Sequence, residues 1–205
     1  MNMHNQIKTI FFDLFGVLLG VDQSVVVQYL SQLTEVPYLE VYESAMGEPF
    51  MRLERGEIGF DKYVDEIRVA LVNGSRIETD VLQDIWMNSK VGEMPAVSFL
   101  EKFQSHYDVW IISNTTESHI KSLKSKFSFL NLVNGIITSE SAQAHKPSQK
   151  IFQFALHEAN TNALSSIFID DNYTNTDTAE SLGIISHHYT SFEGLIKFIN
   201  FSLQI

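Results

Sequence analysis

The stretch that decides the fold, residues 7–20, reads I-K-T-I-F-F-D-L-F-G-V-L-L-G. Its apolar run ends at Asp13, and Gly16 then permits a sharp backbone turn. A run this short, and this rich in β-branched and aromatic residues, predicts a strand buried on both faces. Asp13 then stands at the carboxyl end of the strand, where open α/β sheets bind their ligands. Because an aspartate also serves as a helix cap or a turn residue, Asp13 alone does not define a site.

The composition of the chain is that of a folded protein with one sizeable core. Its 205 residues are 44% hydrophobic and 19% charged, which is typical of globular proteins. This length accommodates one domain with an insertion, whereas two ordinary enzyme domains would be crowded. The formal net charge of -11 argues against a nucleic-acid partner, since such proteins present clustered Lys and Arg.

The absence of cysteine restricts the chemistry that the chain can perform. Without cysteine there is no disulfide and no thiolate, so any metal must be bound by oxygen or imidazole ligands. No segment approaches the roughly 18 apolar residues of a membrane span, and the first residues, M-N-M-H-N-Q-I-K, contain no long apolar region. We therefore expect a soluble cytoplasmic protein without a membrane partner. The sequence carries no signal for an oligomeric state.

The pattern of apolar residues divides the chain into two regions. Helical periodicity predicts helices over 24–33, 37–46, 60–72 and 79–89. We expect residues 20–89 to form a helical cap, inserted into a core of residues 1–19 and 90–205. In the core, strands are predicted over 107–113, 134–138, 165–170 and 184–188, and helices over 95–105, 116–126, 148–159, 174–182 and 191–202. This alternation predicts an α/β, Rossmann-like fold with a mostly parallel sheet and helices on both faces.

Polar side chains recur where the predicted strands end. Ser113 and Asn114 follow one strand, Lys146 follows the next after a short loop, and Asp170 and Asp171 follow a third. Because the carboxyl ends of parallel strands meet at one edge of a sheet, we expect these side chains to lie near the first strand's aspartate. Each has a plain alternative: a helix cap for residues 113–115, a solvated surface position for the lysine, and a helix start for the two aspartates.

This set of side chains suits phosphoryl transfer at a magnesium ion. Mg²⁺ prefers oxygen ligands and is usually held by one or two carboxylates, which Asp13 and Asp171 can supply. Ser113, Asn114, Lys146 and the loop amides near Gly16 can bind the oxygens of a phosphate. Asp13 can then attack phosphorus, giving an aspartyl phosphate that water hydrolyses.

Four segments resemble the motifs of the haloacid dehalogenase-like hydrolases, within the subclass that carries a helical cap. They read F-F-D-L-F-G-V-L, I-I-S-N-T, H-K-P and I-F-I-D-D-N-Y-T-N, and the resemblance runs over residues 8–188. In the predicted cap, M-G-E-P-F and L-E-R-G-E-I are similar to bacterial glucose-1-phosphate phosphatases and to the N-terminal phosphatase domain of mammalian epoxide hydrolase.

The resemblance implies roles for the first two motifs. Asp13 matches the family's nucleophile, which also binds magnesium, and the backbone carbonyl of Phe15 matches the next metal ligand. Gly16 belongs to the loop that approaches the phosphate. Ser113 and Asn114 match the phosphate-binding pair.

The last two motifs imply a lysine and the remaining metal-site residues. Lys146 matches the lysine that steadies both nucleophile and phosphate. Asp171 is preferred over Asp170 as the metal-binding acid, because its distance to Gly183 matches the usual spacing in the family. Asn175 matches an acid or amide that supports the metal ligands without touching the metal.

Three positions depart from the family pattern. Phe15 stands where most phosphatases of the family have an aspartate that protonates the leaving group. Loss of a general acid forfeits about 10²- to 10⁴-fold in rate, which favours a leaving group that needs little protonation, such as that of a sugar 1-phosphate. Ser148 replaces an acid that commonly follows Lys-Pro, and His145 replaces a common arginine.

We therefore expect a Mg²⁺-dependent phosphomonoester hydrolase that acts on a small phosphorylated metabolite. One alternative is a 2-haloacid dehalogenase, since such enzymes carry an aromatic residue where Phe15 stands, although Asp171 would repel a carboxylate substrate in the absence of a cation. Another is a binding protein that kept the fold and lost turnover through Phe15. Candidate substrate contacts in the predicted cap are Met46, Glu48, Phe50, Arg52 and Arg55.

Overall fold

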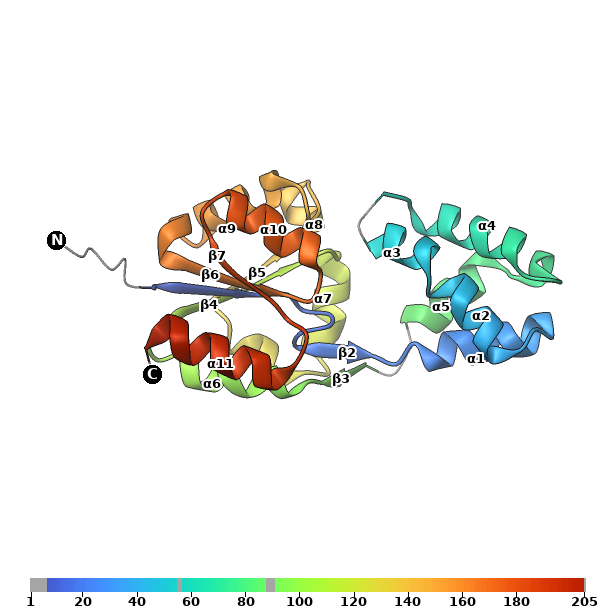
Figure 1. Cartoon of the computed structure of the whole chain (residues 1–205), viewed down its shortest axis with the longest axis horizontal. Helices are drawn as coiled ribbons and strands as arrows, with labels where there is room; N and C mark the ends of the chain where they lie inside the picture. Colours follow the sequence, from blue (N-terminus) through green and yellow to red (C-terminus); the bar gives the residue numbers. More distant parts are fainter. Residues whose placement is uncertain (1–6, 55–56, 88–90, 205) are drawn as a thin grey trace. The chain divides into compact units, whose positions relative to one another are not determined.

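The computed structural model describes residues 7–54, 57–87 and 91–204, and the chain divides into two compact units (Figure 1). One unit, here called the core, combines residues 1–20 with 92–205. The other, here called the cap, holds residues 21–91. The boundary predicted between residues 89 and 90 lies outside the described residues, as does Arg55.

The core contains a five-stranded parallel sheet in the order β5-β4-β1-β6-β7. Its strands are β1 (Thr9–Phe12), β4 (Asp108–Ser113), β5 (Gly135–Thr138), β6 (Ser166–Asp170) and β7 (Ile185–His188). The four strands predicted after the cap each lie within their predicted ranges. The prediction of an α/β fold with a mostly parallel sheet is therefore confirmed.

The first strand lies at the centre of the sheet, which explains its apolar sequence. All four residues of β1 are buried, as are all five of β6, because helices cover both faces of these central strands. Phe12 lies opposite Ile111 of β4 and Ile169 of β6. The Asp13 amide then donates to the Ile169 carbonyl at 2.8 Å, so Asp13 leaves the sheet level with the ends of both neighbouring strands.

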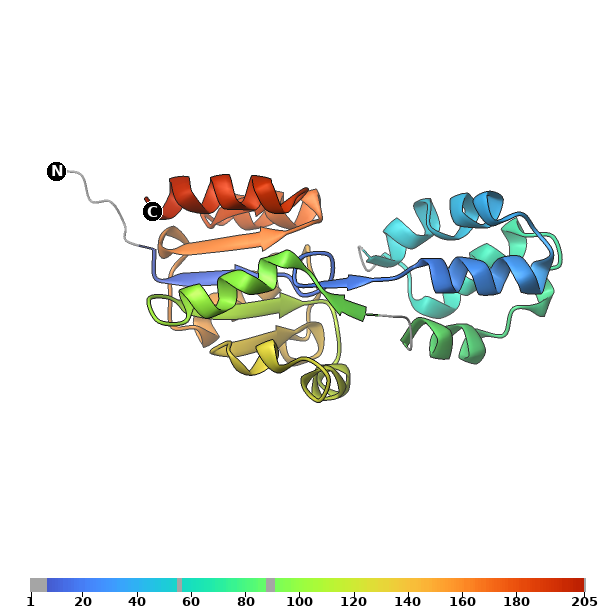
Figure 2. The ribbon, with the colours of Figure 1, turned by 90° about the horizontal axis from the view of Figure 1, so that it is seen from below.

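Helices cover both faces of the core sheet, as predicted. Figures 1 and 2 show α9 and α10 on one face and α6 and α11 on the other. On the first face, Phe11 and Phe168 belong to the same apolar cluster as Phe152 of α9 and Ala179 of α10. The helices of the core are α6 (Ser98–Phe103), α7 (Glu117–Lys124), α8 (Ser139–Ala142), α9 (Gln149–Glu158), α10 (Tyr173–Ser181) and α11 (Phe192–Leu203), with 3-10 helices η2 (Pro95–Val97), η3 (Ser128–Asn131) and η4 (Ala163–Ser165).

The short helix α8 was not predicted, because only a loop was expected between β5 and Lys146. Its start is fixed by a capping box, in which the Thr138 hydroxyl accepts from the Ser141 amide and the Ser141 hydroxyl accepts from the Thr138 amide. A single turn of this kind leaves too few residues for periodicity to show in the sequence.

The cap is helical, with an apolar interior of its own. Its helices are α1 (Ser24–Thr34), α2 (Tyr38–Ala45), α3 (Glu48–Glu54), α4 (Phe60–Ala70) and α5 (Thr79–Met87), with the 3-10 helix η1 (Gly74–Arg76). The sequence analysis did not predict α3, and the predicted end of the last cap helix at residues 88–89 lies outside the described residues. Tyr63 is fully buried in the cap, and its hydroxyl donates to the Ala45 carbonyl at 3.1 Å.

The chain passes between the two units through a pair of short strands. These strands, β2 (Leu19–Val21) and β3 (Val91–Glu93), form a two-stranded sheet. They were not predicted, since three residues are too few to establish the alternation of a strand. Among the described residues, we find no helix with the length and hydropathy needed to cross a lipid bilayer.

Candidate active site

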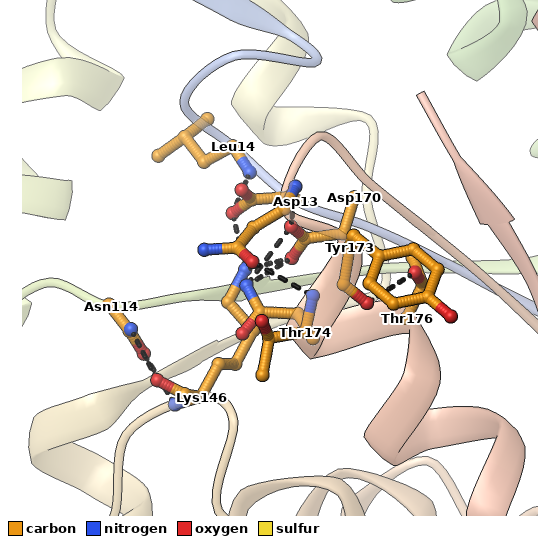
Figure 3. Close-up of polar contacts among 10 residues, drawn as sticks. Asp13, Leu14, Asn114, Lys146, Asp170, Tyr173, Thr174 and Thr176 are labelled. Carbon is orange, nitrogen blue, oxygen red and sulfur yellow. Dashed lines mark hydrogen bonds and ion pairs between the residues drawn. The ribbon is translucent and has the colours of Figure 1, made fainter. Parts of the chain in front are cut away.

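Lys146 lies between two carboxylates at the carboxyl edge of the core sheet (Figure 3). Its Nζ is 2.7 Å from Asp13 Oδ1 and 2.6 Å from Asp170 Oδ2. The exposed fraction of the side chain is 2% for Lys146, 0% for Asp170 and 11% for Asp13. Because little water screens these charges, their attraction is stronger than that of a surface ion pair. Residues that follow three different strands thus form one buried charged group.

The loop that carries Lys146 is held by Asn114, which directly follows β4. The Lys146 amide donates to Asn114 Oδ1 at 2.7 Å, and Asn114 Nδ2 donates to the Lys146 carbonyl at 3.0 Å. Both polar groups of the Lys146 backbone are therefore bound by one side chain (Figure 3). The structure thus assigns Asn114 the positioning of Lys146, while its predicted contact with phosphate stays a prediction.

The turn after Asp13 is shaped to receive the Asp171 carboxylate. Gly16 has φ +86°, a conformation that favours glycine. A Cβ at this position would lie 2.0 Å from Asp171 Oδ2. Any residue other than glycine would therefore clash with the Asp171 carboxylate. Asp13, Asp170 and Asp171 each offer an oxygen, and these oxygens lie within 4.8 Å of one another. The three acids are therefore close enough to share one cation.

The carboxylates of Asp170 and Asp171 differ in the hydrogen bonds that they accept and in their exposure. Asp170 accepts from Lys146 and, through both oxygens at 3.0 Å, from Asn175 Nδ2, and its Oδ1 also accepts from the Asn172 amide at 2.8 Å. Asp171 is the exposed member of the three. This difference favours Asp171 over Asp170 as a metal ligand. Asn175 contacts the buried acid, Asp170.

Ser113 contributes a buried hydroxyl with no hydrogen-bond partner in the part of the chain that the structure describes. The residue is 1% exposed and ends β4. An unpaired buried hydroxyl costs free energy, so its presence at this edge is consistent with a ligand that completes it. A phosphate oxygen is such a ligand.

The ring of Phe15 packs on His119, a residue that the sequence analysis did not single out. The two ring centroids are 5.5 Å apart at an interplanar angle of 21°. His119 Nδ1 lies 2.9 Å from the Thr115 hydroxyl. Burial lowers the pKa of His119, and the charge of Lys126 adds to this effect. Since this contact joins residues more than 100 positions apart, no local pattern could have indicated it.

The other two departures from the family pattern have simple structural outcomes. Ser148 caps α9 by accepting from the Lys150 amide, and His145 is exposed. Lys146 has a direct acidic partner in Asp170, whose Oδ2 lies 2.6 Å from Nζ.

The electrostatics of the cluster favour an additional cation. Burial raises the pKa of Asp13 well above its usual value; Lys146 opposes this shift, whereas Asp170 and Asp171 add to it. Burial alone would lower the pKa of Lys146, but Asp13 and Asp170 outweigh it and hold the pKa above its ordinary value. Partial burial and repulsion from Asp170 raise the pKa of Asp171 to about 6. The cluster has three carboxyl groups and only one ammonium group to balance them. A divalent cation would supply further positive charge.

A comparison with protein families agrees with this site. The model described as "haloacid dehalogenase-like hydrolase" matches residues 7–183, so the chain belongs to the haloacid dehalogenase-like hydrolases. The resemblance of the four motifs to this family is thereby confirmed, and the protein is a member of a hydrolase family.

Solved structures with the same fold come from several bacteria. A HAD family enzyme of Bacteroides thetaiotaomicron, crystallised with magnesium and inorganic phosphate, is 22% identical with a TM-score of 0.62, and the match covers 92% of this chain and 98% of that one. The HAD hydrolase YfnB of Bacillus subtilis, bound to magnesium, is 13% identical with a TM-score of 0.74, and the match covers 98% and 100%. A dehalogenase is 19% identical with a TM-score of 0.63, covering 88% and 83%. At these identities the likeness extends to the fold alone.

Proposed function

We propose that the protein is a Mg²⁺-dependent phosphomonoester hydrolase for small phosphorylated metabolites, with Asp13 as its nucleophile. The observation that carries the proposal is the arrangement of Asp13, Asp170 and Asp171 around Lys146, with oxygens within 4.8 Å of one another. A haloacid dehalogenase-like hydrolase of known structure that contains magnesium and inorganic phosphate is consistent with it.

Asp13, Asp171 and the backbone carbonyl of Phe15 are the proposed magnesium ligands. All are oxygen donors of the kind that Mg²⁺ prefers. Asp170 then stays on Lys146 and Asn175, where it orients the lysine. When bound, Mg²⁺ supplies positive charge for the phosphate oxygens and for the acids themselves.

The hydrogen bonds of Asp13 indicate which of its oxygens attacks. Oδ1 accepts from the Leu14 amide at 2.7 Å and lies 2.7 Å from Lys146 Nζ, so Oδ2 is the oxygen left for chemistry. Oδ2 forms a bond to phosphorus as the bond to the leaving oxygen breaks. Water then attacks phosphorus, which releases inorganic phosphate and restores the Asp13 carboxylate.

The remaining donors at this edge bind the transferring phosphoryl group. Ser113 Oγ is buried without a partner among the described residues, and Lys146 Nζ uses two of its three N–H groups on carboxylates there. One hydroxyl and one ammonium donor are therefore free for phosphate oxygens, whose charge grows in the transition state. The Gly16 amide, a predicted phosphate contact, is not a free donor in this set, because it donates to the Leu19 carbonyl at 2.8 Å.

The side chain of Phe15 has no proton to give, which narrows the substrates that suit the site. An ordinary alcohol leaves slowly without a general acid, whereas an anomeric sugar hydroxyl is more acidic and leaves more easily. We therefore propose sugar 1-phosphates as the first substrates to test. Of the cap candidates, Met46 and Phe50 are buried in the apolar cluster and Arg52 pairs with Glu66 at 3.0 Å, so these three have partners within the cap.

A dehalogenase is the second candidate, because dehalogenases are among the structures with this fold and Phe15 is aromatic. In that reaction Asp13 would attack carbon, and the substrate would carry its own carboxylate. Two further acids beside Asp13 would repel that carboxylate unless a cation were present. The charge of the cluster thus disfavours this reaction.

One set of assays separates the candidates. We expect phosphate release from p-nitrophenyl phosphate and from a sugar 1-phosphate with Mg²⁺, its loss in EDTA, and its loss in Asp13→Asn. The matched control is Asp108→Asn, an exposed acid at the opposite end of β4, which should keep wild-type rates. Chloride release from 2-chloropropionate in EDTA would instead establish the dehalogenase. No turnover of any substrate, with Mg²⁺ bound, would indicate a binding protein.

A further inference from the structure

The last strand of the sheet contacts the loop that carries Asp171. His188 ends β7, at one edge of the sheet, and its Nε2 is 3.0 Å from the Asp171 carbonyl oxygen. Because a carbonyl oxygen can only accept, Nε2 carries the proton and donates. Neither the motifs nor the strand-end pattern indicated this histidine.

The His188 bond acts on the peptide that joins Asp171 to Asn172, whose N–H is already bound by the buried Asp170 side chain. On one side of Asp171, the Asp170 carbonyl accepts from the Tyr189 amide at 2.8 Å. On the other side, the Asn172 amide donates to Asp170 Oδ1 and the Asn172 side chain caps α10. His188 binds the carbonyl of the peptide whose N–H is bound by Asp170, so both polar groups of the peptide after Asp171 have partners. The backbone that carries the Asp171 carboxylate, which lies against Gly16, is thereby held on both sides.

The imidazole of His188 is itself held by Tyr173. The two rings meet edge to face, with centroids 5.8 Å apart at an angle of 76°. Tyr173 is 64% exposed and is the first residue of α10. Edge-to-face contacts between aromatic rings are favourable. The pair therefore gives an exposed histidine a defined orientation.

We propose that His188 is a positioning residue that holds Asp171 in place to bind the divalent cation. The proposal rests on the proposed function only in taking Asp171 as a magnesium ligand. Groups that orient metal ligands in this way are worth about 10- to 100-fold in metal affinity. His188 touches neither the substrate nor the cation, and acts through the backbone of Asp171.

The test is titration of the full-length, EDTA-treated and dialysed protein with Mg²⁺ by calorimetry, without substrate. We expect His188→Ala to raise the Mg²⁺ Kd by about tenfold. His188→Gln should restore most of the affinity, because its amide nitrogen takes the place of Nε2 and donates. This rescue distinguishes a lost hydrogen bond from a general loss of structure.

The neighbouring residue supplies a matched control. His187 lies on the same strand, and its ring stacks on Phe198 of α11 with centroids 4.6 Å apart. His187→Ala should therefore lower the melting temperature and leave the Mg²⁺ Kd at the wild-type value. The reverse result, in which His187→Ala weakens binding as much as His188→Ala, would overturn the proposal.

Other outcomes separate this inference from the function on which it rests. Wild-type affinity in a folded His188→Ala protein, or equal weakening in the Ala and Gln variants, overturns the role of His188 while leaving the phosphatase intact. Failure of the wild-type protein to bind Mg²⁺ overturns both proposals together. Circular dichroism of each variant establishes that it is folded.

Discussion

The two units of the molecule bury different kinds of side chain. In the core, Asp13, Lys146 and Asp170 are charged groups with little or no exposure. In the described part of the cap, Thr34 is the one residue of the polar and charged types that is buried, and its hydroxyl donates to the Leu30 carbonyl. The rest of the cap interior is apolar and aromatic, with the Tyr63 ring contacting Phe50, Phe60 and Trp86.

This difference separates what folding requires from what the site requires. The cap shows that apolar packing suffices for a compact unit of this size. Burying an ionised group costs several kcal/mol, and replacing a buried ion pair by apolar residues is often neutral or stabilising. The charged cluster of the core is therefore poorly explained by stability, and its chemistry is the better reason for it.

The largest expected effect on stability comes from removing the charge of Lys146. Lys146→Met leaves Asp13 and Asp170 buried without their counter-charge, so we expect the free energy of unfolding to fall by about 3–5 kcal/mol at neutral pH. Phosphate release should be lost as well. Urea denaturation followed by circular dichroism measures the first effect, and the exposed Lys150→Met of α9 is the control.

A substitution in the cap should lower stability by a similar amount without affecting metal binding. Leu30→Ala opens a cavity at a fully buried position and should cost about 2–5 kcal/mol. It should leave the Mg²⁺ Kd unchanged, because the cluster lies wholly in the core.

The lysine prediction has its own contradicting outcome. A Lys146→Met protein as stable as Lys150→Met would contradict the view that the core charges depend on one another.

Substituting a glycine is expected to have an intermediate effect in the core and a smaller one in the cap. Gly16→Ala places a Cβ against Asp171 Oδ2 and forces a left-handed conformation, which costs about 1–2 kcal/mol. It should also weaken Mg²⁺ binding, because Asp171 must move. Gly59→Ala in the cap meets no atom within 4 Å and has no positive φ, so it should leave the Mg²⁺ Kd unchanged. Because Gly59 is the N-cap of α4, where alanine is less favourable than glycine, we expect it to cost up to about 1 kcal/mol of stability. Calorimetry and urea denaturation test both variants. Unaltered Mg²⁺ affinity in Gly16→Ala would contradict the view that the turn at Gly16 positions the Asp171 carboxylate.

The smallest expected effect is a pH dependence of the metal-free protein. The pKa of Asp171 is raised to about 6 in the folded state, so the folded state binds its proton more tightly than the unfolded state does. Stability in EDTA should therefore fall as pH rises from about 4 through about 6, by less than about 1 kcal/mol because solvent screens this exposed group. Asp171→Asn should reduce the slope and leave the part that comes from Asp13, whose pKa is also raised; a slope of the same size in that variant would assign it to another group.

The sequence predicted most of the site because its residues follow strands. Asp13 and Asp171 directly follow apolar strands and Ser113 ends one, whereas Lys146 comes after a further segment that contains α8. Parallel strands bring such positions to one edge of a sheet. The choice of Asp171 over Asp170 as a metal ligand stays a prediction, because all three acids lie close enough to share one cation. The roles assigned to these residues stay predictions until they are tested.

The rest depended on contacts that local sequence does not encode. The central place of β1 follows from pairing with strands that come about 100 and 157 residues later. The helices α3 and α8 and the pair β2 and β3 are too short to show a period. His188 reaches Asp171 across 17 residues and a helix, and such a bond leaves no pattern in either segment.

The sharing of Lys146 between two acids has a consequence for turnover under the proposed function. When Asp13 becomes an acyl phosphate, its own carboxylate charge disappears and the negative charge lies on the phosphoryl group instead. Asp170 takes no part in bond making, so its contact with Lys146 Nζ can persist through both halves of the proposed reaction. The ammonium thus keeps one protein partner while the other is modified.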